Sequence, residues 1–353
     1  MCADPCDRDG ALVIDGSAGE GGGQLLRSAL ALSVCRRQLF RIVDIRGRRP
    51  KPGLRPQHLA AVRAAAAISG ARVEGAAIDA REIAFVPGPV AGGAYRFAVG
   101  TAGSTGLVLQ TVLPALVTAD RPSELVLEGG THNPRAPTFE FLARAYLPLI
   151  ERMGPRVAIG LERAGFEPAG GGRVRVRVEP VARLEPLRLE TRGALQALEA
   201  EVMVSKLSRH IAEREAAVLA AGLSVPPASA RIRVIDDSPG PGNVVSVFAV
   251  SENVTEVFTG FGRRGVPAER VAEGVVESVQ RYLSADVPVG VHLADQLLLP
   301  LALAGGGSFV TCAPSAHTLS NIDVIERFLP VAIRCAPVAG ADRWRIEIGG
   351  AAS

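Results

Sequence analysis

The sequence predicts an α/β fold built from three repeated units, each with two helices on a four-stranded sheet, and a small inserted α/β domain. Two observations support the repeats: the order strand, helix, strand, helix, strand, strand occurs twice, and a partial third copy lies near the C-terminus. A third observation supports the insertion: from about 184 to 265 a long alternating segment and several strands interrupt this order. Three α/β repeats with an insertion therefore account for most of the chain.

The elements of each copy follow from apolar spacing. The first copy is expected to place its strands and helices at 12–14, 25–34, 40–45, 54–69 and 72–85. The second copy is expected at 95–99, 105–117, 124–127, 138–153, 156–162 and 173–178. The third is expected at 270–283, 293–303, 309–313, the helix after His317, 331–338 and 343–348. The insertion is expected to hold strands at 195–204, 231–235, 244–250 and 256–261 and a helix at 208–221.

Proline-containing joints at 185–186 and 266–267 suggest where the insertion begins and ends. We therefore expect residues 1–184 to hold repeats one and two of a large domain. Residues 185–265 would form the inserted domain, and residues 266–353 the third repeat with His317.

Composition excludes several classes of protein. The 353 residues include no run of about 18 uncharged apolar residues and no apolar leader at the N-terminus, so neither a membrane span nor secretion is expected. Five cysteines without a C-x-x-C pair favour a reduced, cytoplasmic protein over a disulfide or zinc framework. The net charge of +3 is too small for a protein that coats nucleic acid.

Lysine is almost absent from this sequence. Lys51 and Lys206 are the only two lysines, and neither lies in a K-x-D-G context. A nucleotidyl transferase that adenylates a lysine is therefore improbable, and another nucleophile is needed if the chain transfers nucleotides.

The segment 309–329 places a histidine where an anion could bind. An alternating strand ends before Pro314, and a helical pattern runs from 322 to 329 with Ser320 as its predicted start signal. We expect His317 in a short turn before that helix, where backbone N–H groups and the helix dipole favour a phosphate.

A second candidate is the glycine-rich turn at 15–24, which holds Glu20 and leads into a helix with Arg27 in its first turns. It lacks the lysine of a P-loop, and Gln24 replaces the third glycine of a dinucleotide-binding turn. An acid that can bind Mg²⁺ next to an arginine that can bind phosphate is typical of nucleotide sites. A purely structural tight turn is the alternative. The basic loop 46–53, which includes Arg46, could be a solvated loop or could receive a polyanion.

These motifs together resemble the RNA 3′-terminal phosphate cyclases. The resemblance is carried in order by DGSAGEGGGQLLRSALALS (15–33), KPGLRPQHLAAV (51–62), YRFAVGTAGSTGLVLQTVLPAL (95–116), GGTHNPRAP (129–137), GFEPAGGG (165–172), HIAERE (210–215), GPGN (240–243), LADQLLLPLALAG (293–305) and HTLSNIDVIERFLP (317–330). It implies three α/β repeats with an inserted domain and an ATP-dependent enzyme that converts an RNA 3′-phosphate to a 2′,3′-cyclic phosphodiester.

The resemblance also implies roles for single residues. His317 would attack the α-phosphate of ATP and carry AMP, and Glu20 would approach a divalent metal, Mg²⁺ or Mn²⁺, on the triphosphate. Arg27 and Arg46 would hold phosphates. The nucleotide pocket would be formed by Gln110, His292, Leu293, Ala294, Asp295 and Gln296. RNA with a 3′-phosphate is the expected partner, and the oligomeric state is open.

Two positions depart from the family pattern. Ser320 stands where threonine is usual, and His292 stands where tyrosine is frequent. Serine keeps the hydroxyl, whereas histidine offers a smaller stacking face for a base, so altered kinetics are expected. His58, His132 and His210 are expected to be surface or packing residues, although His210, near Arg209 and Arg214, could lie on a face that contacts RNA.

The sequence leaves three other functions open. One is a cyclase-like binding protein of ribosome assembly, which would share the fold but lack the catalytic histidine. A second is an enolpyruvyl transferase, which the shortage of lysine disfavours. A third is adenylation of other phosphorylated ends, such as a DNA 5′-phosphate, as a side activity.

Overall fold

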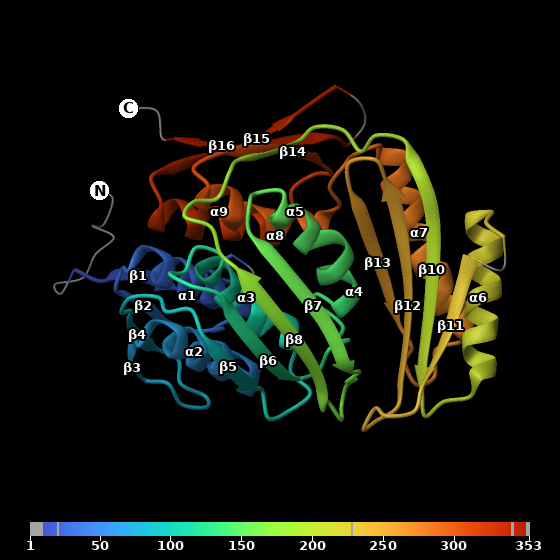
Figure 1. Ribbon diagram of the computed structural model, residues 1–353, viewed down its shortest axis with the longest axis horizontal. Helices are drawn as coiled ribbons and strands as arrows, with labels where there is room; N and C mark the ends of the chain where they lie inside the picture. The colour runs from blue at the N-terminus through green and yellow to red at the C-terminus, as the bar shows by residue number, and fades with distance from the viewer. Residues whose placement is uncertain (1–9, 20, 227–228, 340–341, 351–353) are drawn as a thin grey trace.

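The computed structural model describes residues 10–350 except 20, 227, 228, 340 and 341. Its described strands form four four-stranded sheets, and three of these sheets share one topology (Figure 1). In each of the three, the strand order in space is first, second, fourth, third, and only the first two strands are parallel. The predicted α/β class and the repeated order of elements are confirmed.

The first repeat contributes one sheet and two helices. Its elements are β1 (Leu12–Asp15), α1 (Gly23–Arg36), β2 (Phe40–Val43), α2 (Pro56–Ser69), β3 (Arg72–Glu74) and β4 (Ile83–Val86). The second repeat has the same order, with its second helix broken by a π-helical segment. Its elements are β5 (Ala94–Ala98), α3 (Thr105–Leu116), β6 (Ser123–Gly129), α4 (Phe139–Phe141), η1 (Leu142–Tyr146), α5 (Leu147–Glu151), β7 (Arg156–Arg163) and β8 (Gly172–Glu179).

The third repeat is interrupted between its first strand and its first helix. Its elements are β9 (Leu187–Leu189), α8 (Val291–Leu303), β14 (Gly307–Thr311), α9 (Ala316–Phe328), β15 (Val331–Pro337) and β16 (Trp344–Gly350). The fourth sheet lies between β9 and α8 in the chain. Its elements are β10 (Leu195–Ser205), α6 (Arg209–Leu223), β11 (Ala230–Ile235), β12 (Gly242–Ser251), β13 (Thr255–Phe261) and α7 (Ala268–Ala285).

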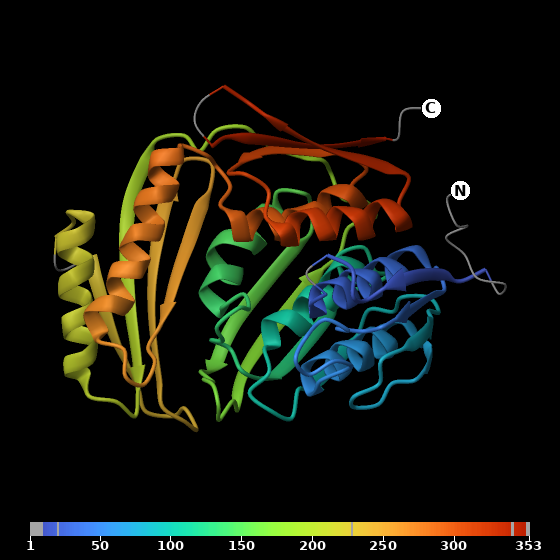
Figure 2. The same ribbon diagram turned by 180° about the vertical axis from the view of Figure 1, so that it is seen from behind.

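Two elements bear on the predicted division at 184/185 and 265/266, which stays a prediction. β9 pairs in parallel with β14 and so completes the third sheet. α7 packs with α6 on the fourth sheet, because its apolar face, including Val275 and Val279, joins the buried cluster of that sheet. The inserted domain therefore has its own core, formed by one face of its sheet and two helices (Figures 1 and 2).

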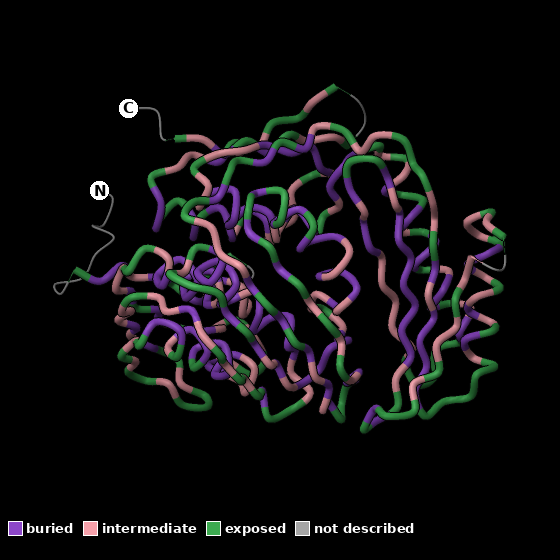
Figure 3. Tube along the Cα trace, viewed as in Figure 1, coloured by how far each residue is buried: buried purple, intermediate pink, exposed green. Residues whose placement is uncertain are grey.

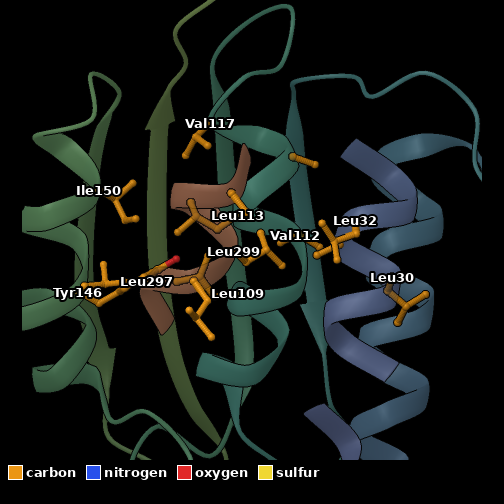
Figure 4. Packing of buried hydrophobic residues seen from close by; sticks show 14 of the residues in the cluster. Leu30, Leu32, Leu109, Val112, Leu113, Val117, Tyr146, Ile150, Leu297 and Leu299 are labelled. Atoms are coloured by element: carbon orange, nitrogen blue, oxygen red, sulfur yellow. The ribbon is translucent and has the colours of Figure 1, made fainter. Parts of the chain in front are cut away.

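The main core lies where the helices of the three repeats meet, with the three sheets outside (Figures 1 and 2). Figure 3 shows the buried residues concentrated along these central helices. Figure 4 shows side chains of α1, α3, α5 and α8 converging, among them Leu32, Leu113 and Leu297. Burying this apolar surface stabilises the packing of the repeats against one another. It also fixes the N-terminal ends of α1, α8 and α9 relative to each other.

Candidate active site

His317 lies in the first turn of α9, not in a turn before the helix. The helix begins at Ala316, and the Oγ of Ser315 accepts a hydrogen bond from the Thr318 N–H at 3.0 Å. The predicted start at Ser320 is wrong: its Oγ donates to the carbonyl of Ala316 at 2.8 Å, inside the helix. Ser315 follows Pro314 directly and reaches the helix start first, so it is the N-cap. His317 does follow a strand at a helix start, as predicted, but the helix begins before His317 and not after it.

Asp295 of α8 faces this helix start. Its Oδ1 accepts hydrogen bonds from Thr318 Oγ1 at 2.5 Å and Ser315 Oγ at 3.4 Å. Burial raises the pKa of Asp295, while these hydroxyl bonds and the charges of His317 and His292 lower it. We call Asp295, Ser315, His317 and Thr318 the hydroxyl wall.

Asn321 fastens the hydroxyl wall to its neighbours. Its Nδ2 donates to the carbonyl of Asp295 at 3.2 Å, and its Oδ1 accepts from Ser28 Oγ at 2.6 Å. Asn321 and Ser28 are both buried. One side chain on α9 is therefore bonded to α8 and to α1, which fixes the direction of the first turn of α9.

Two glutamines join the second and third repeats. Gln110 Nε2 of α3 donates to Gln296 Oε1 of α8 at 2.8 Å. Gln110 Oε1 in turn accepts from Arg27 Nε of α1 at 3.2 Å. Arg27, Gln110 and Gln296, predicted from three distant motifs, thus form one hydrogen-bonded chain. Its last member, Gln296, follows Asp295 in the sequence.

A second part of the site is cationic. The pKa of His58 is lowered to about 3, mainly by burial. The positive charges of Arg27, Arg46 and Arg55 lower it further. Burial also lowers the pKa of Arg27 to about 10, and no ion pair found within the described residues includes it. Arg55 differs, because it is ion-paired with Asp79. A charged guanidinium desolvated without an acid is stabilised by a bound anion. We call Arg27, Arg46, Arg55 and His58 the cationic wall.

The glycine-rich turn packs against the cationic wall and against Ser320 of α9. A Cβ on Gly23 would lie 2.4 Å from His58 Nε2 and 2.9 Å from Arg27 Nη1. A Cβ on Gly19, whose φ is +54°, would lie 2.1 Å from Ser320 Oγ. Glycine is required at both positions because another backbone or side chain already occupies that space. Glu20, the predicted metal ligand in this turn, lies outside the described residues.

The remaining predicted residues differ in their surroundings. Arg46 donates to the carbonyls of Lys51 and Gly53 at 2.5 and 3.1 Å, which holds the basic loop closed. His292 is exposed on the first turn of α8. Leu293 and Ala294 are buried in the main core. Their roles in a nucleotide pocket stay predictions.

Sequence reasoning missed part of the site. His58 is buried and accepts a hydrogen bond from the Arg55 N–H at 3.1 Å, which caps α2 beside the arginines. The signal was present in the stretch 51–62, where Arg55 and His58 are three residues apart at a helix start, the spacing of a capping pair. Ser315 was also missed because Ser320 offered a competing start signal.

The other histidines lie elsewhere. His132 is fully buried, with Nε2 2.9 Å from Glu140 Oε2 and its ring stacked on Phe166. His210 is exposed on α6, 3.7 Å from Glu213. His132 is a packing residue and His210 a surface residue, as predicted.

A cleft of about 440 Å³ opens beside the cationic wall. It is bounded by the first turns of α2 and α3, and its lining includes Arg55, Gln57, Ser104, Asn133 and Arg135. Gln57 precedes His58 in α2, so the cleft and the cationic wall share one helix start. The Oδ1 of the buried Asn133 has no hydrogen-bond partner among the described residues.

Comparison with known proteins identifies the family. Residues 18–335 match the family described as RNA 3′-terminal phosphate cyclase. The chain belongs to the RNA 3′-terminal phosphate cyclase family. It is 52% identical over 338 residues to the RNA 3′-terminal phosphate cyclase of Ralstonia nicotianae, covering 96% of this chain and 97% of that one. The cyclase of Koribacter versatilis is 48% identical (96% and 97% covered), and that of Ectopseudomonas mendocina 51% (92% and 94%).

The described residues offer neither a ready-made metal cluster nor a membrane-spanning helix. Within the described residues, no group of three or more His, Cys, Asp or Glu side chains could hold a metal ion. Mg²⁺ in nucleotide sites usually takes one or two carboxylates and completes its shell with phosphates and water, so a site of that kind does not require three such side chains. No described helix has the length and apolarity needed to span a bilayer.

Proposed function

We propose that this chain converts an RNA 3′-terminal phosphate to a 2′,3′-cyclic phosphodiester with ATP, through AMP carried on His317. The observation that supports the proposal is the pairing of the two walls. Arg27, which has no described carboxylate partner, is bonded to Gln110, and Gln110 is bonded to Gln296 of α8. Asp295 of the same helix is bonded to the first turn of α9, which holds His317. A triphosphate needs the positive charge of the cationic wall, and a nucleotidyl transfer needs the nucleophile of the hydroxyl wall.

The first step forms a phosphorus–nitrogen bond. The neutral imidazole of His317 supplies an electron pair to the α-phosphorus, the bond from that phosphorus to the bridging oxygen breaks, and pyrophosphate leaves with the electrons. Arg27 would neutralise charge on the phosphates as they depart. The N-terminal end of α9, with the Ser315 hydroxyl, would stabilise the charge on the α-phosphate.

The next two steps return the enzyme to its starting state. An oxygen of the RNA 3′-phosphate attacks the same phosphorus, and His317 regains its electron pair as the phosphorus–nitrogen bond breaks. The adjacent 2′-hydroxyl then attacks the RNA phosphorus, AMP leaves, and the hydroxyl proton is released. Because the hydroxyl is already adjacent, ring closure needs activation and little positioning.

A divalent cation, Mg²⁺ or Mn²⁺, would neutralise the triphosphate when bound. Glu20 is the proposed protein ligand, with phosphate oxygens supplying further ligands. The nucleotide would lie along α8, with Gln110, Asp295 and Gln296 as its polar contacts and His292, Leu293 and Ala294 in the same stretch.

We further propose that the cleft beside α2 receives the RNA end. It shares the α2 helix start with the cationic wall, and Arg55 and Arg135 supply positive charge. No aromatic residue is among those that line it, so contacts to phosphate and sugar would dominate over stacking on bases. Binding should therefore tolerate many terminal sequences.

The test is incubation with α-labelled ATP and Mg²⁺ or Mn²⁺, followed by denaturation. Label should stay on the protein, survive alkali and be lost in acid. His317→Ala should lower labelling by at least about 10⁴-fold, as removal of a covalent nucleophile does. His210→Ala is the matched control and should label like the unchanged protein. His210 is exposed on α6 of the inserted domain and has no proposed contact with ATP.

Two outcomes would overturn the proposal. Full labelling of His317→Ala would show that another residue carries AMP. No labelling of the unchanged protein, combined with tight RNA binding, would favour the alternative of a non-catalytic cyclase-like binding protein.

A further inference from the structure

Glu256 connects the inserted domain to the start of α8. It lies on β13, is 2% exposed, and its Oε2 accepts a hydrogen bond from the Gly290 N–H at 2.9 Å. Gly290 is the N-cap residue of α8. The contact is close: a Cβ on Gly290 would lie 3.1 Å from the carboxyl carbon of Glu256. A carboxylate of one domain is therefore bonded to the first residue of a helix in another.

Helix α8 has no cap of its own. Gly290 has no side chain, and the first turn of the helix contains no acidic residue. A helix start normally gains a side-chain acceptor or a negative charge from nearby residues in its own sequence. Here both are supplied by Glu256, which precedes Gly290 by a whole helix, α7.

The residues that α8 presents are those assigned to the nucleotide. His292 is in its first turn, and Asp295 and Gln296 follow in the next. Asp295 bonds the start of α9, and Gln296 bonds Gln110. A small displacement of the start of α8 would change all of these contacts.

We propose that the inserted domain forms part of the nucleotide site: Glu256 caps α8 and thereby positions His292, Asp295 and Gln296. Glu256 is a positioning residue, since it acts through the helix and touches no reacting group. The proposal rests on the proposed function for its kinetic test, but the cap itself can be tested without activity.

The surroundings of Glu256 decide its charge. Burial raises its pKa to about 7, against the lowering effect of the Gly290 and Val257 N–H groups. Tyr282 of α7 and Cys312 after β14 also face it, and both have raised pKa values, so both are neutral at pH 7. Arg192 faces this region too and is paired with Asp286 at 3.0 Å. Glu256 therefore changes charge within the neutral range.

The sign of this shift separates stability from function. A raised carboxyl pKa means that the folded protein favours the neutral acid, so this group lowers stability as pH rises from about 4.5 to about 7. The charged form is nevertheless the better cap for α8. Glu256→Gln should therefore maintain or increase stability above pH 7 while weakening the cap, which a merely structural residue would not do.

A second buried glutamate provides a matched control. Glu215 of α6 is fully buried, its pKa is also raised to about 7, and it accepts a hydrogen bond from Asn243 Nδ2 at 2.7 Å. Glu215 and Asn243 both belong to the inserted domain, and neither is bonded to α8. Glu215→Gln thus removes the same kind of charge from the same domain.

The experiment measures the adenylation rate as a function of ATP concentration, on either side of pH 7. It compares the unchanged chain with Glu256→Gln and Glu215→Gln. For Glu256→Gln we expect the apparent KM for ATP to rise about fivefold above pH 7. Its difference from the unchanged chain should vanish below pH 7, where Glu256 is already neutral. Glu215→Gln should follow the unchanged chain at every pH.

Amide hydrogen exchange tests the cap independently of adenylation. The Gly290 N–H and the first turn of α8 should exchange faster in Glu256→Gln than in Glu215→Gln. Unchanged exchange and unchanged KM in Glu256→Gln would overturn the proposal, as would an equal rise in KM in both variants. Faster exchange in a chain that never forms the adenylate would support the cap and contradict only the proposed function.

Discussion

The two walls of the site differ in how they are held. The hydroxyl wall is closed by hydrogen bonds within the protein. Thr318 and Ser315 donate to Asp295, and Asn321 donates to α8 and accepts from Ser28 of α1. The cationic wall is held differently: Arg55 is ion-paired with Asp79, but Arg27 has no described carboxylate partner and lies near a neutral His58. One wall is complete without a ligand, and the other needs an anion to balance its charge. The difference indicates that binding energy comes from the cationic wall and orientation of the nucleophile from the hydroxyl wall.

The largest effect after loss of His317 should come from the cationic wall. Arg27→Gln should lower the adenylation rate by about 10²-fold, because a desolvated charge beside the transferring phosphate is removed. Arg36→Gln, at the exposed end of the same helix, is the control and should leave the rate unchanged. Rates of label transfer from ATP measure both. An equal rate in Arg27→Gln would show that the cationic wall does not hold the triphosphate.

A smaller effect is expected from the hydroxyl wall. Asp295→Asn keeps the size of the side chain but removes the charge that accepts from Thr318 and Ser315, so adenylation should slow by about tenfold. Melting temperatures check that the variant is folded, and Asp237→Asn in an exposed loop of the inserted domain is the control. If Asp295→Asn changed only ATP affinity and not the maximal rate, Asp295 would contact the nucleotide without orienting His317, and the comparison would fail.

The last effect concerns stability and pH, not the reaction rate. The pKa of His58 is lowered to about 3, so the folded protein favours neutral His58, and its contribution to stability is present above about pH 6.5 and lost as pH falls towards 3. Between about pH 7 and about pH 5 this group should cost about 2 kcal/mol of unfolding free energy. His58→Gln keeps a capping acceptor and should remove that loss. Urea unfolding at the two pH values measures it, and His210→Gln should retain the loss seen in the unchanged chain.

Local patterns in the sequence predicted the repeats well. Strand and helix periods are set by which side chains face the core, and three copies of one topology repeat that signal. The positions of Arg27, Gln110, Asp295 and His317 followed from motifs, but their proximity did not, because it depends on how four helices pack. The start of α9 was misplaced since Ser315 and Ser320 both offer a hydroxyl near the right place. Glu256 gave no signal, because its partner Gly290 is brought to it by tertiary packing alone.

The inserted domain also differs from the repeats in what holds it to the rest. Phe248, Val254 and Val257 join the main core, and Arg144 of the second repeat lies over the Phe248 ring at 4.0 Å. Apolar packing and one cation–π contact thus anchor this domain near η1.

The parallel pairing of β9 with β14 has a consequence for how the chain is made. Leu187 and Gly307 are neighbours in the third sheet, but the whole inserted domain is synthesised between them. The first two repeats can form their sheets from segments that emerge close together, whereas β9 must wait for its partner. Loop closure over so long a segment is slow unless the intervening residues are already compact. Early folding of the inserted domain would shorten the distance between β9 and β14. During translation it would thereby help these two strands of the third repeat to pair.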